Sequence, residues 1–261
     1  MLLKNKVAVI YGAAGAIGTA VAHSFANQGA SLFLAGRTLE TLEALAKEIN
    51  LNGGKAAIAQ VDALDKTAVE DHLKTVMQKA GRIDISFNLI AYNDRQGNAL
   101  TEMVIEDYAT PIANAMHTHF ITGTAAARYM STQGSGVILA LTANAGRKPY
   151  THSGGFGVAC AAIEAYCRQL AAETGKDGVR VVCLRSAGSP DTPGVQNAIK
   201  KHADKEGVPV ETFEKNFAAV TMLKRLPLAA EIANTAALAA SDLSSAITAA
   251  VINVTCGEIA D

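Results

Sequence analysis

The sequence predicts an α/β protein built as a single doubly wound domain, in which a seven-stranded parallel sheet is flanked by helices. Short apolar segments suited to strands buried on both faces alternate with longer segments whose apolar residues recur at helical spacing. A glycine-rich turn joins the first strand to the first helix. Alternation of this kind specifies parallel strands connected by crossover helices. No repeat, low-complexity tract or linker divides the chain, so residues 1–261 are expected to form one domain.

The first half of the chain alternates without interruption. Residues 7–11 form a short apolar run, and Ile17, Val21 and Phe25 then recur at helical spacing before Gly29, which is placed to cap the helix. The following segments are a strand over 31–35, a helix over 39–49, a strand over 56–61, a helix over 69–80 and a strand over 83–90.

The second half continues the pattern, except between residues 189 and 226. It comprises a helix over 102–132, a strand over 137–141, a helix over 155–175, a strand over 179–184, a helix over 232–240 and a strand over 249–254. The insert at about 189–226 combines proline and glycine with charged helical pieces, which suggests a mobile lid over a site. An ordinary surface insertion has the same composition, so both interpretations stay open.

The bulk composition excludes several classes of function. The chain is 49% hydrophobic and 18% charged, with a formal net charge of −1. It therefore lacks the basic surface that nucleic acid or an anionic membrane requires. No apolar stretch is long enough to span a bilayer, and the first six residues lead into a strand without the apolar region of a signal peptide. We expect a cytoplasmic protein with no nucleic-acid or membrane partner.

The cysteines and histidines predict no metal site. His117 and His119 lie two residues apart, so on a helix they face different directions. The four cysteines show no metal-ligand spacing, and we interpret them as reduced, mostly buried thiols. They are Cys160, Cys167, Cys183 and Cys256.

The turn after the first strand has the form of a dinucleotide-binding loop. Residues 12–18 read Gly-Ala-Ala-Gly-Ala-Ile-Gly and open the first helix. Glycines there permit a tight turn and close backbone approach, and the helix N-terminus offers unpaired N–H groups to a pyrophosphate. A plain strand-to-helix turn is the alternative, but the bracketing by strand and helix favours a nucleotide site in a Rossmann-type domain.

With this loop the sequence resembles the short-chain dehydrogenase/reductase family, and the resemblance covers nearly the whole chain. The family's Thr-Gly-x-x-x-Gly-x-Gly appears with Tyr11 and Ala16 in place of the Thr and the middle Gly. Residues 88–91 stand where the family has Asn-Asn-Ala-Gly, and 187–193 where it has Pro-Gly-x-x-x-Thr. The resemblance implies a nicotinamide dinucleotide, and a homotetramer or homodimer formed through the helices over 102–132 and 155–175. It assigns cofactor contacts to Gly12, Gly15, Ile17, Gly18, Asp62, Asn88, Ala91 and Thr192.

The end of the second strand favours NADP(H) over NAD(H). An acidic residue there would accept hydrogen bonds from a ribose 2′-hydroxyl and repel a 2′-phosphate. This chain has Arg37 and Thr38 instead, and a guanidinium can stack on adenine and bind phosphate. The alternative is that Arg37 is a solvated surface cation.

The resemblance places no proton donor where the family keeps its own. Family members use a Ser after the fifth strand, a Tyr thirteen residues on and a Lys four residues further. Here those positions hold Ala143, Phe156 and Cys160, and the family's Asn falls at or beside Ala115. Phenylalanine has no exchangeable proton, and general acid catalysis is worth about 10²–10⁴ in rate. Ketone reduction by the family's mechanism is therefore expected to be very weak.

Other residues of the same loop are candidates for the missing donor. Tyr150 and His152 lie just before Phe156, and Tyr92 follows the fourth strand where family members line the substrate pocket. Each is more often an ordinary loop or wall residue. Cys160 is a conceivable nucleophile, but without a neighbouring cation its thiol stays protonated, which favours a packing role.

Three functions fit these observations. The first is an atypical NADP(H)-dependent oxidoreductase that acts on a small-molecule substrate. Its proton would come from Tyr150, His152, Tyr92, water or the substrate itself in place of the family's Tyr–Lys pair. The second is a non-catalytic NADP(H)-binding sensor or subunit. The third is a non-redox lyase or isomerase in the same pocket. Fold analogy cannot choose among them, because function depends on the site.

Overall fold

A computed structural model describes residues 1–260 and contains the predicted seven-stranded parallel sheet. The strand order is β3-β2-β1-β4-β5-β6-β7, and every neighbouring pair is parallel. This order reverses direction between β1 and β4, which is where open α/β sheets bind ligands. The strands are β1 (Val7–Tyr11), β2 (Ser31–Gly36), β3 (Lys55–Gln60), β4 (Ile85–Asn88), β5 (Gly136–Ala143), β6 (Val179–Ser186) and β7 (Ala250–Val254).

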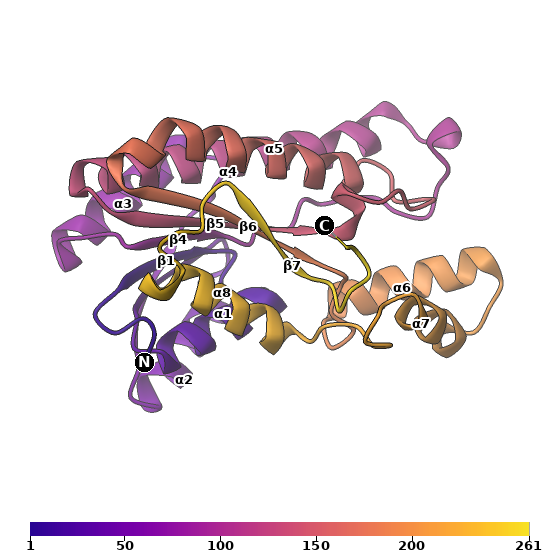
Figure 1. Cartoon of the computed structure of the whole chain (residues 1–261), viewed down its shortest axis with the longest axis horizontal. Helices are drawn as coiled ribbons and strands as arrows, with labels where there is room; N and C mark the ends of the chain where they lie inside the picture. The colour runs from indigo at the N-terminus through magenta and orange to yellow at the C-terminus, as the bar shows by residue number, and fades with distance from the viewer. Residues whose placement is uncertain (261) are drawn as a thin grey trace.

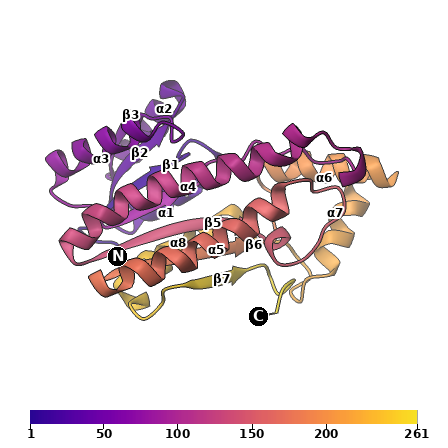
Figure 2. The ribbon, with the colours of Figure 1, turned by 90° about the horizontal axis from the view of Figure 1, so that it is seen from above.

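Helices cover both faces of the sheet, as Figures 1 and 2 show. One face carries α1 (Ala16–Asn27), α2 (Leu39–Leu51) and α8 (Ala229–Ala240), and the other carries α3 (Lys66–Ala80), α4 (Ile105–Gln133) and α5 (Phe156–Thr174). Each layer packs on the sheet through its own cluster of buried apolar side chains. The short 3₁₀ helices are η1 (Leu100–Glu102), η2 (Asn144–Gly146), η3 (Gly175–Asp177) and η4 (Asp242–Ser244).

The boundaries of several predicted elements were wrong, among them those of β4, α4, β5 and β6. Strand β4 covers 85–88 rather than 83–90. The Ile90 N–H donates to the Asn88 side chain at 3.0 Å instead of to a neighbouring strand, so the chain leaves the sheet there. Helix α4 begins at Ile105 rather than at 102, since η1 precedes it. Strands β5 and β6 each run two residues further than predicted, to Ala143 and Ser186.

The extra length of β5 and β6 depends on a buried polar cluster. The apolar pattern ends before Thr142 and Arg185, but both pair with Glu164 of α5. The Arg185 guanidinium contacts the Glu164 carboxylate at 2.8 Å, and both side chains are almost fully buried. A buried charge is tolerated when it is paired and hydrogen-bonded, so polar residues continue the strands here.

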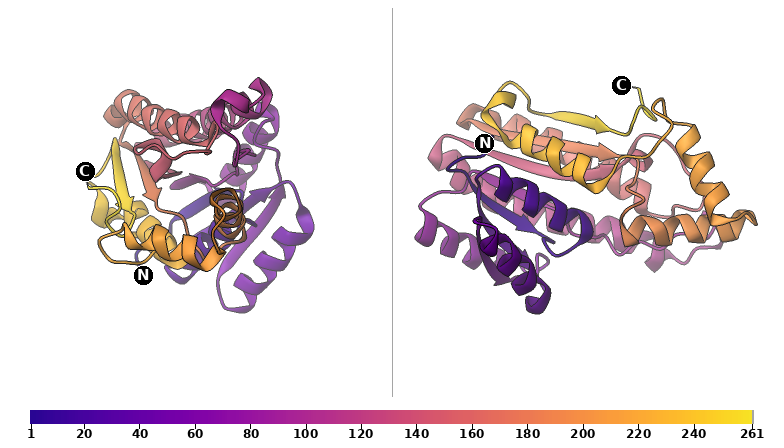
Figure 3. Two further views of the ribbon diagram at one scale, coloured as in Figure 1. Left: turned by 90° about the vertical axis from the view of Figure 1, so that its right-hand side faces the viewer. Right: turned by 90° about the horizontal axis from the view of Figure 1, so that it is seen from below.

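The insert after β6 forms two helices beyond the carboxyl ends of the strands. They are α6 (Pro193–Glu206) and α7 (Val210–Ala219), and the right-hand view of Figure 3 shows them past the end of the sheet. Thr192 is the N-cap residue of α6 and Pro193 follows it, as helix starts favour. Gly207 ends α6 in the left-handed conformation (φ 67°).

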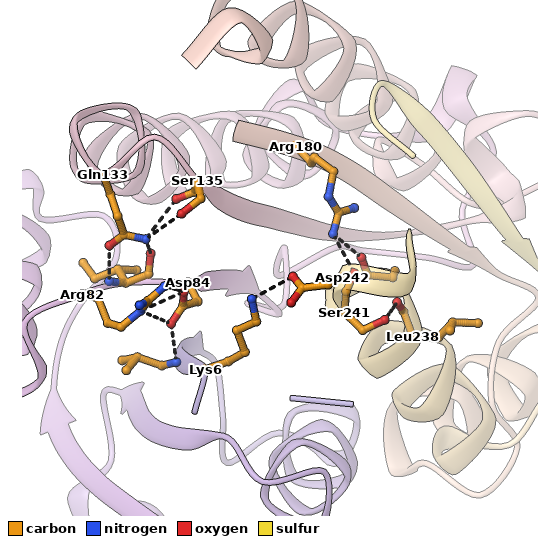
Figure 4. Close-up of polar contacts among 12 residues, drawn as sticks. Lys6, Arg82, Asp84, Gln133, Ser135, Arg180, Leu238, Ser241 and Asp242 are labelled. Carbon is orange, nitrogen blue, oxygen red and sulfur yellow. Dashed lines mark hydrogen bonds and ion pairs between the residues drawn. The ribbon is translucent and has the colours of Figure 1, made fainter. Parts of the chain in front are cut away.

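The opposite, amino-terminal edge of the sheet is fixed by polar contacts, shown in Figure 4. The buried Asp84 carboxylate accepts the Val7 N–H at 2.8 Å, which satisfies the start of β1. Arg180 of β6 donates to the carbonyls of Ala239 and Ile247, both at 3.0 Å, and so ties the end of α8 to the sheet. These contacts hold the edge that faces away from α6 and α7.

Candidate active site

A cavity of about 650 Å³ lies at the carboxyl edge of the sheet, between the strand ends and the α6–α7 pair. Its wall comprises residues 15–18 at the start of α1, parts of the loops after β4, β5 and β6, and one side of α6 and α7. Loops at this edge of a parallel sheet are where such folds place their ligands. The cavity is therefore the candidate active site.

The glycine turn at one end of the cavity requires glycine at two positions. Gly12 has φ 71°, and a Cβ on it would lie 2.7 Å from the Leu89 carbonyl oxygen. A Cβ on Gly18 would lie 2.7 Å from the Ala13 carbonyl oxygen. Ala16, which replaces the family's middle glycine, is exposed, so its methyl group meets no such obstacle.

This turn fits the pyrophosphate of a dinucleotide. Helix α1 begins at Ala16 with Gly15 as its N-cap residue, and no side chain caps it. The first N–H groups of a helix have no partner within it, and the helix dipole favours an anion there. Exposed backbone, no capping side chain and no room for a Cβ make a cradle that suits a phosphate group.

The structure divides the predicted cofactor residues into two groups. Gly15, Ile17, Gly18, Ala91 and Thr192 line the cavity. Gly12 belongs to the turn but does not line the cavity. Outside the lining too, at the exposed ends of β2 and β3, lie Arg37, Thr38 and Asp62.

Arg37 and Asp62 share one corner of the sheet. Gly36 and Gln60, at the ends of β2 and β3, are partners in register, and the Gln60 side chain donates to the Arg37 carbonyl at 2.9 Å. Asp62 accepts the Leu64 N–H at 3.0 Å, while the Arg37 guanidinium has no ion pair among residues 1–260. An exposed cation without a carboxylate partner is available to an anion.

The Asn88 side chain points into the protein. Its amide donates to Thr122 Oγ1 at 3.2 Å and its Oδ1 accepts the Ile90 N–H at 3.0 Å. Asn88 is buried and does not line the cavity. In this arrangement it shapes the loop after β4.

Ser189 is a cavity residue that the sequence reasoning missed. The Thr192 hydroxyl, expected to bind the nicotinamide amide, donates to the Ser189 carbonyl at 2.7 Å. The Ser189 Oγ is buried, lines the cavity and has no hydrogen-bond partner within residues 1–260. A buried polar atom without a partner in a cavity wall fits a ligand that supplies one. Ser189 and Thr192 together would face the amide end of the cofactor.

Apolar or inert groups occupy the three positions where the resemblance places the family's catalytic residues. Ala143 and Phe156 line the cavity, and the Phe156 ring packs against Tyr92 at a centroid distance of 5.9 Å. Cys160 is fully buried, and burial raises the pKa of its thiol to about 12, which supports the packing role. The Tyr92 hydroxyl donates to the Leu141 carbonyl at 2.6 Å, and burial raises its pKa. Neither the thiol nor the Tyr92 phenol is placed as a donor.

Tyr150 lines the cavity and belongs to a polar cluster. Its hydroxyl donates to the Glu258 carboxylate and accepts a hydrogen bond from the Asn144 amide at 3.1 Å. Lys148 Nζ lies 3.2 Å from Glu258 Oε1 and 5.4 Å from the centre of the Tyr150 ring. A tyrosine and a lysine therefore lie together here, joined through a carboxylate. Burial and the hydrogen bond to Glu258 raise the pKa of Tyr150, so the phenol keeps its proton at neutral pH.

Two turns bring this cluster together from distant parts of the chain. The N–H groups of Arg147 and Lys148 both donate to the Asn144 carbonyl at 2.8 Å, which folds the loop after β5. After β7, Cys256 and Gly257 have φ 53° and 79°, and this turn directs Glu258 back toward β5. The sequence carries no local signal for the pairing, because Glu258 and Tyr150 are 108 residues apart.

His152, the second predicted donor, does not line the cavity. It adopts the left-handed conformation (φ 59°), and its carbonyl accepts the Gly97 N–H at 2.8 Å. That backbone contact joins the loops after β4 and β5. Because His152 does not line the cavity, we do not propose it as a proton donor.

The α6–α7 pair adds an aromatic row to the cavity. The centroid distances are 6.2 Å from Tyr150 to Phe217, 6.3 Å from Phe217 to Phe213 and 5.9 Å from Phe213 to His202. His202 Nε2 lies 3.0 Å from Gln96 Oε1, which links α6 to the loop after β4. The insert therefore forms part of the cavity wall.

Within residues 1–260, no helix is long and apolar enough to cross a membrane. Across the same part of the chain, no group of three His, Cys, Asp or Glu side chains is arranged to hold a metal ion.

A doubly wound sheet with a glycine turn at its switch point and a cavity at its carboxyl edge is the arrangement in which folds of this class bind dinucleotides. A family model described as "Enoyl-(Acyl carrier protein) reductase" matches residues 12–258. The chain belongs to the short-chain dehydrogenase/reductase family and is an oxidoreductase of that type.

Two relatives are at least 30% identical to this chain over most of its length. An uncharacterized oxidoreductase of Staphylococcus epidermidis is 33% identical over 193 residues, covering 73% of this chain and 80% of the relative. The uncharacterized oxidoreductase YxbG of Bacillus subtilis is 30% identical over 246 residues, covering 94% of this chain and 88% of YxbG.

Solved structures share the fold at low identity. An NAD⁺-bound xylitol dehydrogenase superposes with a TM-score of 0.92 at 22% identity, covering 97% of this chain and 99% of that one. A polyketide ketoreductase with NADPH superposes with a TM-score of 0.87 at 21% identity, covering 97% of both chains. These likenesses establish the fold.

Proposed function

We propose that this chain is an NADP(H)-dependent oxidoreductase that reduces a small molecule and takes the proton from Tyr150 rather than from the residue at position 156. The observation that carries the proposal is the Tyr150 phenol in the cavity wall, in contact with Asn144 and Glu258. Solved members of the fold class bind NAD⁺ or NADPH, which supports a nicotinamide cofactor here. The substrate itself stays open.

The residues present fit two parts of such a cofactor. The turn at 12–18 would hold the pyrophosphate, and Ser189 with Thr192 would hold the nicotinamide amide. When bound, the cofactor supplies a hydride to the substrate. The apolar side chains of Ala143 and Phe156 exclude water from the wall beside it.

The chain's own chemical task is to neutralise the negative charge that hydride transfer leaves on the substrate. Tyr150 is protonated at neutral pH because burial raises its pKa, and its side chain reaches the cavity. A positioned general acid contributes about 10²–10⁴ in rate. A conjugated alkene or an imine makes smaller demands on this acid than a ketone, so both belong among the test substrates.

Turnover of NADPH with a panel of ketones, enals and imines tests the proposal. We expect oxidation of NADPH, followed by its absorbance, with at least one class. Tight NADPH binding with no turnover across the panel would instead support a sensor. Conversion of a compound with no change in nicotinamide absorbance would support a lyase or isomerase.

Replacing Arg37 by Asp is expected to move the preference from NADP(H) toward NAD(H). A carboxylate would replace the exposed guanidinium. It repels a ribose 2′-phosphate and accepts a hydrogen bond from a ribose 2′-hydroxyl. A shift of at least tenfold in the ratio of dissociation constants corresponds to about 1.4 kcal/mol. Calorimetric titration with both dinucleotides measures it.

Lys176→Asp reverses an exposed charge on η3, at the opposite edge of the sheet, and serves as the control. It should leave the ratio unchanged. Equal affinity of the unmutated protein for both dinucleotides would contradict the NADP(H) assignment.

A further inference from the structure

A continuous series of polar groups leads from solvent to the cavity. The Lys148 side chain is 43% exposed, and its Nζ lies 3.2 Å from Glu258 Oε1. The Glu258 side chain is 0% exposed and accepts the Tyr150 hydroxyl. Tyr150 in turn lines the cavity. Each group contacts the next: Lys148 is exposed to solvent at one end of the series, and Tyr150 lines the cavity at the other.

The direction of the Tyr150 hydrogen bond gives Glu258 a task. A phenol has one proton, and here that proton is directed at the carboxylate. Tyr150 can point its proton into the cavity only when Glu258 carries a proton of its own and donates to the phenol oxygen. The side-chain amide of Asn144 contacts both partners and holds them in place, but it has no proton to transfer.

The Glu258 side chain is buried, which is unusual for a carboxylate that only anchors a turn. A carboxylate withdrawn from water is costly unless it is paired and hydrogen-bonded, and this one receives donors from Tyr150, Asn144 and Lys148. A neutral amide would keep one acceptor oxygen for Tyr150 and Lys148 without that cost, and would lose only the contact with Asn144. The feature that an amide could not reproduce is the capacity to gain and lose a proton.

We propose that Lys148 and Glu258 form a proton relay that reprotonates Tyr150 from solvent during each turnover. The proposal rests on the proposed function, because it needs a reaction that consumes a proton. As the substrate accepts a hydride, its anionic atom takes the Tyr150 proton. In the same event the Glu258 carboxylate receives a proton from the Lys148 ammonium and passes it to the Tyr150 oxygen, which leaves Tyr150 a phenol, Glu258 a carboxylate and Lys148 a neutral amine. The Lys148 amine then takes one from water, so one solvent proton is consumed per substrate reduced.

Glu258→Gln is the central variant for the test, since it keeps the shape and one acceptor oxygen for Tyr150 and Lys148 but cannot relay a proton. Its amide NH₂ group cannot accept the hydrogen bond from Asn144, so that one contact is lost. We expect kcat to fall at least tenfold and the solvent deuterium isotope effect on kcat to rise. The KM for NADPH should stay unchanged. Lys148→Met should lower kcat several-fold, and its exposed position makes misfolding a poor explanation. Glu173→Gln, an exposed carboxylate change on α5, is the matched control and should behave as the unmutated protein.

Chemical rescue separates a relay from a structural anchor. Added formate should restore part of the kcat lost in Glu258→Ala, because a small acid can enter the vacated space and carry the proton. A residue that only fastens the turn would not be rescued in this way. Absence of rescue, together with a full kcat in Glu258→Gln, would overturn the relay.

A further measurement needs no substrate. Tyrosinate absorbance, taken as the difference from Tyr150→Phe, should show that Glu258→Gln lowers the pKa of Tyr150, because the carboxylate raises it. No change in that pKa would contradict the contact on which the relay depends. If Tyr150→Phe loses turnover while Glu258→Gln and Lys148→Met keep it, the relay is wrong and the proposed function stands. Full turnover in Tyr150→Phe would overturn both.

Discussion

Tyr150→Phe is expected to lower kcat by about 10²–10⁴, the range that a positioned general acid contributes. The ring stays, so its contact with Phe217 on α7 is kept and the cavity retains its shape. The phenol proton is lost, and Phe156 cannot replace it. The dissociation constant for NADPH should not change, because Tyr150 is not among the residues proposed to hold the cofactor. Single-turnover oxidation of NADPH with the best substrate of the panel measures the loss.

Tyr129→Phe is the matched control for this variant. Tyr129 lies on α4, is packed against the buried cluster on that face and does not line the cavity. It should turn over at the unmutated rate. A Tyr150→Phe protein that also keeps the full rate would show that the proton comes from elsewhere.

Gly18→Ala is expected to weaken NADPH binding at least tenfold and to destabilise the fold. The new Cβ would lie 2.7 Å from the Ala13 carbonyl oxygen and would also clash with Gly12. Backbone on both sides must shift, and overpacking of this kind costs about 1–3 kcal/mol. The same backbone shift would move the N–H groups at the N-terminus of α1 that are proposed to bind the pyrophosphate. Calorimetric titration with NADPH and thermal unfolding measure the two effects.

Gly194→Ala provides the comparison. Gly194 also lines the cavity, but a Cβ there meets no atom within 4 Å and its φ is not in the left-handed region. It should bind NADPH as the unmutated protein does. Equal affinity of Gly18→Ala and the unmutated protein would contradict the assignment of this turn to the pyrophosphate.

Most of the fold could be predicted because its signals are local. Buried parallel strands are apolar on both faces, so runs such as 7–11 stand out against helical spacing. The errors fell where tertiary pairing overrides composition. Thr142 and Arg185 continue β5 and β6 only because Glu164 is buried beside them, and no pattern within a strand announces a partner on α5.

The candidate site was predictable only in part, for the same reason. The glycine turn is a local motif, and Tyr150 could be named because it lies in the loop before Phe156. Its partner Glu258 comes from beyond β7, where sequence distance hides the contact. His152 is two residues from Tyr150 in the sequence, which is why the two are candidates together. In the structure His152 has a left-handed backbone and does not line the cavity.

The most direct test of Tyr150 as the proton donor is a crystal structure with NADPH and a substrate or close analogue bound. We predict that the Tyr150 hydroxyl lies within about 2.6–3.2 Å of the substrate atom that receives the proton, which is hydrogen-bonding reach. The opposite result would be a different titratable side chain at that atom, with Tyr150 still bound to Glu258 and out of reach.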